Sequence, residues 1–132
     1  MPRVEAYEAG NQALLAAGRA TPQARRFYES HLRNWESSFA VLQDHAAQGI
    51  RVARRPIVLS TEPVSIEDFQ GNAAAIVLRR CLDQSDLGTT RQGVPVPPRY
   101  DDPVVQEVVV IRYENLTWRI ASLETTGVPC TG

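Results

Sequence analysis

Apolar residues recur at steps of three or four along the first fifty positions, which is the spacing of one face of an α-helix. The first such stripe lies in the segment VEAYEAGNQALLAAGRA, residues 4–20. Its members are Val4, Tyr7, Leu14, Leu15 and Ala17, with Asn11 on the same face. Gly18 interrupts the pattern, so we expect the first helix to end there.

A second and a third helix are predicted before residue 49. Thr21-Pro22 supplies a hydroxyl N-cap and a proline at the first helical position, where the missing N–H costs nothing. The apolar positions that follow are Ala24, Phe27, Tyr28, Leu32, Trp35, Phe39 and Leu42. Their spacing predicts a short helix near 22–30 and a longer one to about 48, with a break around Ser30-His31. Gly49 is expected to close the longer helix as its C-cap.

The chain changes character after the third helix, where β-branched residues and prolines replace the helical stripes. Residues 51–69, RVARRPIVLSTEPVSIEDF, contain Pro56 and Pro63. Since proline is confined to edge strands and bends, this segment predicts an edge strand or two short strands joined at a bend. Residues 70–72, Gln-Gly-Asn, predict a turn, and AAAIVLRRCLD at 73–83 predicts a strand.

The last third of the chain predicts a further hairpin. Residues 86–100 hold glycines and prolines, which fits a long hairpin loop or a ragged pair of strands. VVQEVVVIRY at 104–113 has the strongest strand pattern, Glu114-Asn115 turns it, and LTWRIASLET at 116–125 returns as its partner. Helices first and antiparallel strands afterwards are the α+β pattern. We expect one domain over residues 1–132, with helices at about 4–48 and a sheet at about 50–127.

Composition and charge exclude some classes of protein. Hydrophobic residues make up 43% and charged residues 22%, as in ordinary globular domains. The 14 basic residues, all arginine, balance 15 acidic ones, so there is no strong field toward nucleic acid or an anionic membrane. No apolar run approaches the roughly 18 residues that span a bilayer. No signal peptide follows Met1, so either the protein is cytoplasmic or an export segment preceded Met1.

Four short motifs resemble those of small actinobacterial domains that lie outside the membrane, on lipoproteins or after a single membrane helix. They are Gln48-Gly49-Ile50, Cys81-Leu82-Asp83-Gln84-Ser85, Trp118-Arg119-Ile120 and Gly127-Val128-Pro129-Cys130. Domains associated with mycobacterial cell-entry transporters are one such group, within the nuclear transport factor 2-like superfamily. The match spans roughly residues 4–130. It departs from the family at the hairpin turn, which is Glu114-Asn115 here and usually looks like Asp-Gly.

The resemblance implies a cone: N-terminal helices packed on a curved antiparallel β-sheet around an internal cavity. It also implies a disulfide between Cys81 and Cys130 that would staple the C-terminal tail to the sheet. The cysteine count alone favours two unpaired thiols, with Cys81 as a small buried apolar residue. A disulfide would argue for a location outside the cytoplasm, because disulfides persist in oxidising compartments.

Enzymes of this superfamily work inside the cone, where a carboxylate acts as general base and a Tyr, His or second acid polarises a carbonyl. The residues that fit these roles are Asp83 as the base, with Tyr28 or His31 as the polarising group. Simpler interpretations exist for two of them: Asp83 bonds its loop through Ser85, and His31 is a solvated residue at a helix end. The candidates for lining the cavity are Phe27, Tyr28, Trp35, Phe39 and Trp118, most of which also fit a core.

Metal and cofactor sites are not predicted. His31 and His45 are far apart in the sequence, and Asp101-Asp102 has no third ligand at useful spacing. Phosphate-binding glycine loops and nucleophile elbows are absent from the sequence. His45, next to Asp44 on the polar side of its helix, is expected at the surface.

Two other motifs are interpreted as structural. A basic patch would form if two strands pair; its members are Arg51, Arg54, Arg55, Arg79 and Arg80. Because aromatic residues do not interleave with these arginines, a solvated sheet face fits better than a nucleic-acid site. The sequon Asn115-Leu116-Thr117 falls where a hairpin turn favours Asn, so we interpret it as a turn.

The function predicted from the sequence is a noncatalytic, extracytoplasmic binding or assembly module. It would present its sheet or cavity to a protein partner or a small apolar ligand, and would reach a membrane only through an anchor upstream of Met1. A homodimer is compatible with this interpretation, because sheets of this fold often pair face to face. The alternative is a small cyclase- or isomerase-like enzyme that uses Asp83 with Tyr28 or His31.

Overall fold

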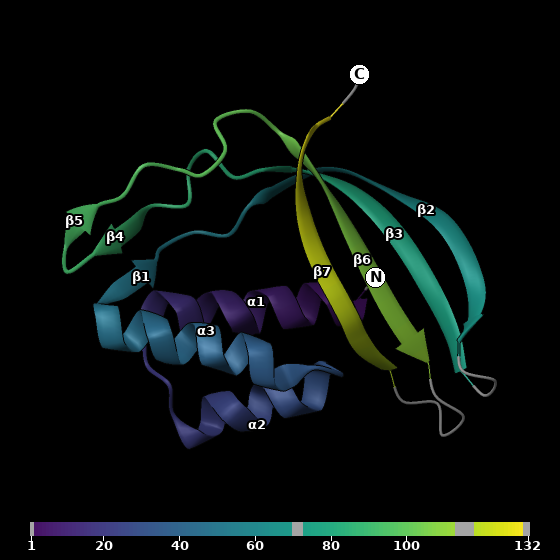
Figure 1. Ribbon diagram of the computed structural model, residues 1–132, viewed down its shortest axis with the longest axis horizontal. Helices are drawn as coiled ribbons and strands as arrows, with labels where there is room; N and C mark the ends of the chain where they lie inside the picture. Colours follow the sequence, from purple (N-terminus) through teal and green to yellow (C-terminus); the bar gives the residue numbers. More distant parts are fainter. Residues whose placement is uncertain (1, 70–72, 113–117, 131–132) are drawn as a thin grey trace.

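Three helices precede all of the strands (Figure 1). The computed structural model describes residues 2–69, 73–112 and 118–130. The helices are α1 (Pro2–Ala17), α2 (Pro22–His31) and α3 (Trp35–Gln48). They confirm the predicted order, including the break after His31. The predicted turns at 70–72 and Glu114-Asn115 and the sequon at 115–117 lie outside the described residues.

Local capping sets the boundaries of α2 and α3. The Thr21 hydroxyl oxygen accepts a hydrogen bond from the Ala24 N–H at 3.1 Å, as expected of an N-cap. Gly49 follows α3 in the left-handed conformation, with φ 67°, and its N–H donates to the His45 carbonyl oxygen. Only glycine adopts this conformation freely, so Gly49 ends the helix and turns the chain into the first strand.

The strands form two antiparallel sheets. The smaller one has the order β1-β4-β5 and consists of β1 (Ile50–Val52), β4 (Thr89–Arg91) and β5 (Val94–Pro95). The larger one has the order β2-β3-β6-β7 and consists of β2 (Ile57–Phe69), β3 (Ala73–Asp83), β6 (Val104–Arg112) and β7 (Trp118–Pro129). Helices packed against antiparallel sheets confirm the predicted α+β class.

The segment around the two prolines becomes two strands in different sheets. β1 pairs with β4, whereas β2 is a long edge strand that pairs with β3. Pro63 lies inside β2, which is permitted because an edge strand has one row of unpaired N–H groups. The register of β2 shifts between Val58 and Ser60 and again between Pro63 and Ser65. Such bulges bend a strand locally.

The C-terminal strand is longer than predicted. β7 continues past residue 125 to Pro129, where Pro129 pairs with Val104 of β6. The tail beyond it is fixed by a disulfide between Cys81 and Cys130, whose Cα atoms lie 5.9 Å apart. This confirms the pairing that the resemblance implied. By the chain-entropy account a loop of this size destabilises the unfolded chain by roughly 4 kcal/mol.

The core lies between the helices and strands β3, β6 and β7. Its buried members are Val4, Tyr7, Ala24, Tyr28, Leu32, Leu42, Leu78, Val108, Val110 and Ile120. In Figure 1 the long strands of the larger sheet extend beyond the helices on the side of β2. Correspondingly, β2 exposes several large apolar side chains to solvent: Ile57, Val58, Leu59 and Val64. Within the described residues, no helix is long and apolar enough to cross a membrane.

Candidate functional site

Asp83 occupies the last position of β3 and bonds its own loop. Its Oδ1 atom accepts hydrogen bonds from the Ser85 N–H at 2.9 Å and the Ser85 hydroxyl at 2.6 Å. These bonds, the hydroxyl bond foremost, lower the pKa of Asp83. A general base that removes a proton from carbon needs the opposite shift. The local loop role of Asp83 is therefore the one that the contacts support.

Tyr28 is a buried core residue with a hydrogen-bonded hydroxyl. Its side chain is 1% exposed, and its hydroxyl donates to the Oδ1 atom of Asn11 at 2.6 Å. Burial raises the pKa of Tyr28 above its ordinary value. The bond joins α2 to α1, which explains why a polar Asn11 lies on the apolar stripe of the first helix.

His31 is the last residue of α2, as predicted for a helix-end residue, but its side chain is half-buried and not fully solvated. Its Nδ1 atom lies 2.9 Å from the Phe27 carbonyl oxygen, and its ring centroid lies 4.4 Å from that of Phe27. His31 also borders a small crevice with Trp118. The other cavity-lining candidates, Phe27, Trp35 and Phe39, pack partly buried against the core. None of these aromatic candidates borders the two larger cavities described below.

Two further predictions need correction. His45, expected at the surface, is half-buried, and its Nδ1 atom is buried without a hydrogen-bond partner among the described residues. The arginine patch does not form as predicted, because β1 pairs with β4 and not with β3. Arg54 instead pairs with Asp86 at 2.6 Å on the exposed surface, and Arg80 points into the protein.

A row of polar residues crosses the larger sheet around Arg80. Thr61 of β2, Arg80 of β3, Gln106 of β6 and Thr125 of β7 are direct neighbours in the strand register. Arg80 and Gln106 are the buried members, at 5% and 8% exposure. The Gln106 amide nitrogen donates to the Thr125 hydroxyl oxygen at 3.3 Å. The row places polar groups on the sheet face that is turned toward α1.

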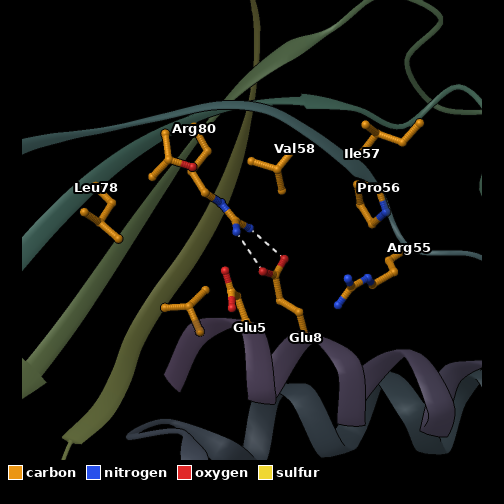
Figure 2. Close-up of a pocket in the computed structure, with 10 residues that line it drawn as sticks. Glu5, Glu8, Arg55, Pro56, Ile57, Val58, Leu78 and Arg80 are labelled. Carbon is orange, nitrogen blue, oxygen red and sulfur yellow. Dashed lines mark hydrogen bonds and ion pairs between the residues drawn. The ribbon is translucent and has the colours of Figure 1, made fainter. Parts of the chain in front are cut away.

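Glu8 of α1 completes this row through a buried ion pair (Figure 2). Two Arg80 nitrogens, Nη1 and Nη2, each donate to a different Glu8 carboxylate oxygen at 2.7 Å. The Nε and Nη2 atoms of Arg80 also donate to the Gln106 Oε1 atom, at 3.0 and 2.6 Å. A bidentate geometry with further hydrogen bonds is the arrangement that compensates for burying two charges. The pair ties α1 to the middle of the sheet.

An open cavity of about 530 Å³ lies beside the ion pair, between α1 and strands β2 and β3. Its lining consists of Val4, Glu5, Glu8, Arg55, Pro56, Ile57, Val58, Thr61, Leu78 and Arg80. Five of these side chains are apolar, and Arg80 with Glu8 forms a fixed polar group at the cavity wall (Figure 2). We refer to this space as the α1–β2 cavity. Its size falls within the range of small-molecule sites, which is about 300–1,000 Å³.

A second cavity of about 340 Å³ adjoins the first. Glu8, Arg55 and Pro56 border both, so the helix and the β1–β2 connection shape the two spaces together. Gln106 faces the second cavity, and Gln12 near it holds α1 to β1 by donating to the Val52 carbonyl oxygen at 2.7 Å. Within the described ranges, no group of three or more His, Cys, Asp or Glu residues could hold a metal ion.

Sequence reasoning missed the Glu8–Arg80 pair and the cavity beside it. One signal was present: Arg80 lies between Leu78 and Leu82, and alternate residues of a strand share a face. All three are buried. An arginine between two buried leucines needs an acidic partner, but nothing in the sequence pointed to Glu8, which lies 72 positions away.

Comparison with known proteins adds no relative: no protein-family model matches the chain, and no curated protein matches it either.

Proposed function

We propose that the protein is a noncatalytic binding module that works outside the cytoplasm and holds a small ligand with an apolar body in the α1–β2 cavity. The observation that carries the proposal is the composition of the cavity wall. Apolar side chains such as Val58 and Leu78 surround a buried Arg80 whose donors are already engaged by Glu8 and Gln106. Half of the lining residues are apolar, and ligand sites likewise combine apolar side chains with polar groups held in place.

The ion pair suits a binding role better than a catalytic one. Arg80 donates four hydrogen bonds to Glu8 and Gln106, so its guanidinium is held in place and only part of its donor capacity is left for a substrate. Asp83, the candidate base of the enzyme interpretation, has a lowered pKa and borders neither of the two cavities. These observations favour binding over proton transfer.

The proposal includes the cone-shaped fold of the nuclear transport factor 2-like superfamily. It is supported by the order of the elements and by the bulges in β2, because bulges bend strands around a concave face. A location outside the cytoplasm is supported by the Cys81–Cys130 disulfide, since such bonds persist in oxidising compartments. Alkylation of the unreduced, denatured protein from its native host should label neither cysteine; two labels would contradict the location.

An assembly role is supported by β2. This edge strand exposes Ile57 and Leu59, which are 58% and 54% exposed. An edge strand offers unpaired backbone groups to a partner strand, and exposed apolar side chains add to the contact. A partner at β2 would also border the mouth of the α1–β2 cavity, because Ile57 belongs to both.

A neutral apolar fluorophore, N-phenyl-1-naphthylamine, tests the binding proposal. Its emission should rise on addition of the wild-type protein. Val58→Trp should abolish the rise because the indole fills the cavity beside Arg80, whereas Val41→Trp should not. Val41 is a matched control because it is also an exposed valine, at 52% against 41%, and does not border the α1–β2 cavity. Equal emission with both variants, or none with the wild type, would contradict the proposal.

A further inference from the structure

Four charged side chains line the α1–β2 cavity, and two of them form an ion pair with each other. Glu8 and Arg80 neutralise each other through two hydrogen bonds of 2.7 Å. Glu5 and Arg55 have no ion-pair or hydrogen-bond partner in the part of the chain that the structure describes. The cavity therefore offers a ligand one carboxylate and one guanidinium whose charges are not matched within the protein.

The two unmatched charges come from different elements and lie apart. Glu5 belongs to α1, one helical turn before Glu8, while Arg55 belongs to the connection between β1 and β2. In Figure 2 the Glu5 carboxylate and the Arg55 guanidinium lie on either side of Glu8. No salt bridge joins them, so each can accept a ligand group of the opposite sign.

Resting on the proposed function, we infer that the ligand of the α1–β2 cavity is an aliphatic zwitterion. Its cationic end lies near Glu5, its anionic end lies near Arg55, and its apolar body contacts side chains such as Val58 and Leu78. A ligand with only one charge satisfies one of the two groups and leaves the other unmatched. A zwitterion engages both groups, so the lining favours a ligand that carries both signs.

Glu5 and Arg55, and not the Glu8–Arg80 pair, set the direction of the ligand. Because Glu8 and Arg80 are already paired, they add little net charge, and discrimination falls to Glu5 and Arg55. Both of these side chains are exposed, so each contact strengthens binding by at most about fivefold at low salt. A ligand of the same chain length with one charge already makes one of these contacts, so we expect the zwitterion to be preferred over it by up to about fivefold.

Three ligands of one chain length test the inference by titration calorimetry with the full chain at low ionic strength. They are ω-aminooctanoate, octylamine and octanoate, which carry both charges, the positive charge alone and the negative charge alone. We expect ω-aminooctanoate to bind up to about fivefold more tightly than either of the other two, and added salt to remove most of the difference. Octylphosphocholine below its micelle concentration has the same chain length and separates the sources: tighter binding than ω-aminooctanoate assigns the zwitterion to a lipid headgroup, and weaker binding assigns it to a free zwitterion.

Charge-neutralising variants identify the residues that cause the preference for the zwitterion. Glu5→Gln should bring the affinity for ω-aminooctanoate down to that for octanoate, and Arg55→Gln should bring it down to that for octylamine. Glu36→Gln and Arg26→Gln are matched controls, because both residues are exposed and neither borders the cavity. Unchanged selectivity in the first two variants would overturn the inference.

The outcomes also separate the inference from the proposed function. Equal binding of all three ligands, lost in Val58→Trp, would overturn the zwitterion and leave cavity binding intact. A preference for ω-aminooctanoate that persists in Val58→Trp would place the site elsewhere and overturn both.

Discussion

The Glu8–Arg80 ion pair should control the stability of the fold in an asymmetric way. Glu8→Leu leaves the Arg80 guanidinium, 5% exposed, without its carboxylate, whereas Arg80→Met leaves a Glu8 carboxylate that is 19% exposed. Water can reach the carboxylate more readily than the guanidinium. We therefore expect Glu8→Leu to lower the free energy of unfolding more than Arg80→Met.

The magnitudes follow from the burial of each charge. Removal of one partner from a buried ion pair costs about 3–5 kcal/mol, which we expect for Glu8→Leu. For Arg80→Met we expect about 2–3 kcal/mol, part of it from the Gln106 oxygen that loses two donors. The double variant replaces both charges by apolar groups and should lie within about 2 kcal/mol of the wild type. The coupling energy of the cycle is then on the order of 4 kcal/mol.

Urea unfolding with the disulfide intact measures these differences. Trp35 and Trp118 report the transition by fluorescence, and both pack against the core. Since small proteins have only about 5–15 kcal/mol of stability, Glu8→Leu could be too unstable to measure. Glu8→Gln is the milder substitute, because its amide oxygen still accepts from Arg80. Additive effects in the double variant, or a loss below about 1 kcal/mol for Glu8→Leu, would refute the reasoning.

Three further predictions concern packing, covalent linkage and ionisation. Cys130→Ala should destabilise the protein by up to roughly 4 kcal/mol in urea unfolding, and a reductant should have the same effect on the wild type only. Gly10→Ala should lower stability by about 1–3 kcal/mol, because the added Cβ would overlap a carbon of the Phe27 ring; a wild-type melting temperature would contradict this close packing. Burial raises the pKa of Tyr7 to about 12 and also raises that of Tyr28. Because tyrosines in the unfolded chain ionise near pH 10, the stabilising contribution of Tyr7 is complete below that pH and is lost as pH rises through about 12, and that of Tyr28 changes in the same direction. An absorbance titration in which all tyrosines ionise together near pH 10 would contradict this.

The helices could be predicted because their signals are local. The hydroxyl of Thr21 and the left-handed Gly49 act within a few residues of the helix ends that they fix. The strand at 73–83 was likewise evident from its apolar run. The division of 51–69 into β1 and β2 was left open because prolines mark an interruption but do not say which sheet each half joins.

The α1–β2 cavity could not be predicted because its lining comes from four separate parts of the chain. Glu5 and Glu8 lie on one helix, Arg55 lies in a connection, and Thr61 and Arg80 lie on neighbouring strands. Which residues meet depends on strand order and register, and these depend on long-range packing. The five arginines were grouped by an assumed pairing, so the separate role of Arg80 was lost.

Arg80 and Cys81, which are successive residues of β3, each make a long-range connection. Successive residues of a strand face opposite sides, so Arg80 reaches inward to Glu8 while Cys81 reaches the C-terminal tail from the other side. Their neighbours on β6 are the successive residues Gln106 and Val105. The ion pair spans 72 positions of sequence and the disulfide spans 49, so each links segments that lie far apart in the chain. The wall of the α1–β2 cavity at Arg80 is thus fixed from both faces, which leaves the exposed Glu5 and Arg55 as the groups free to adjust to a ligand.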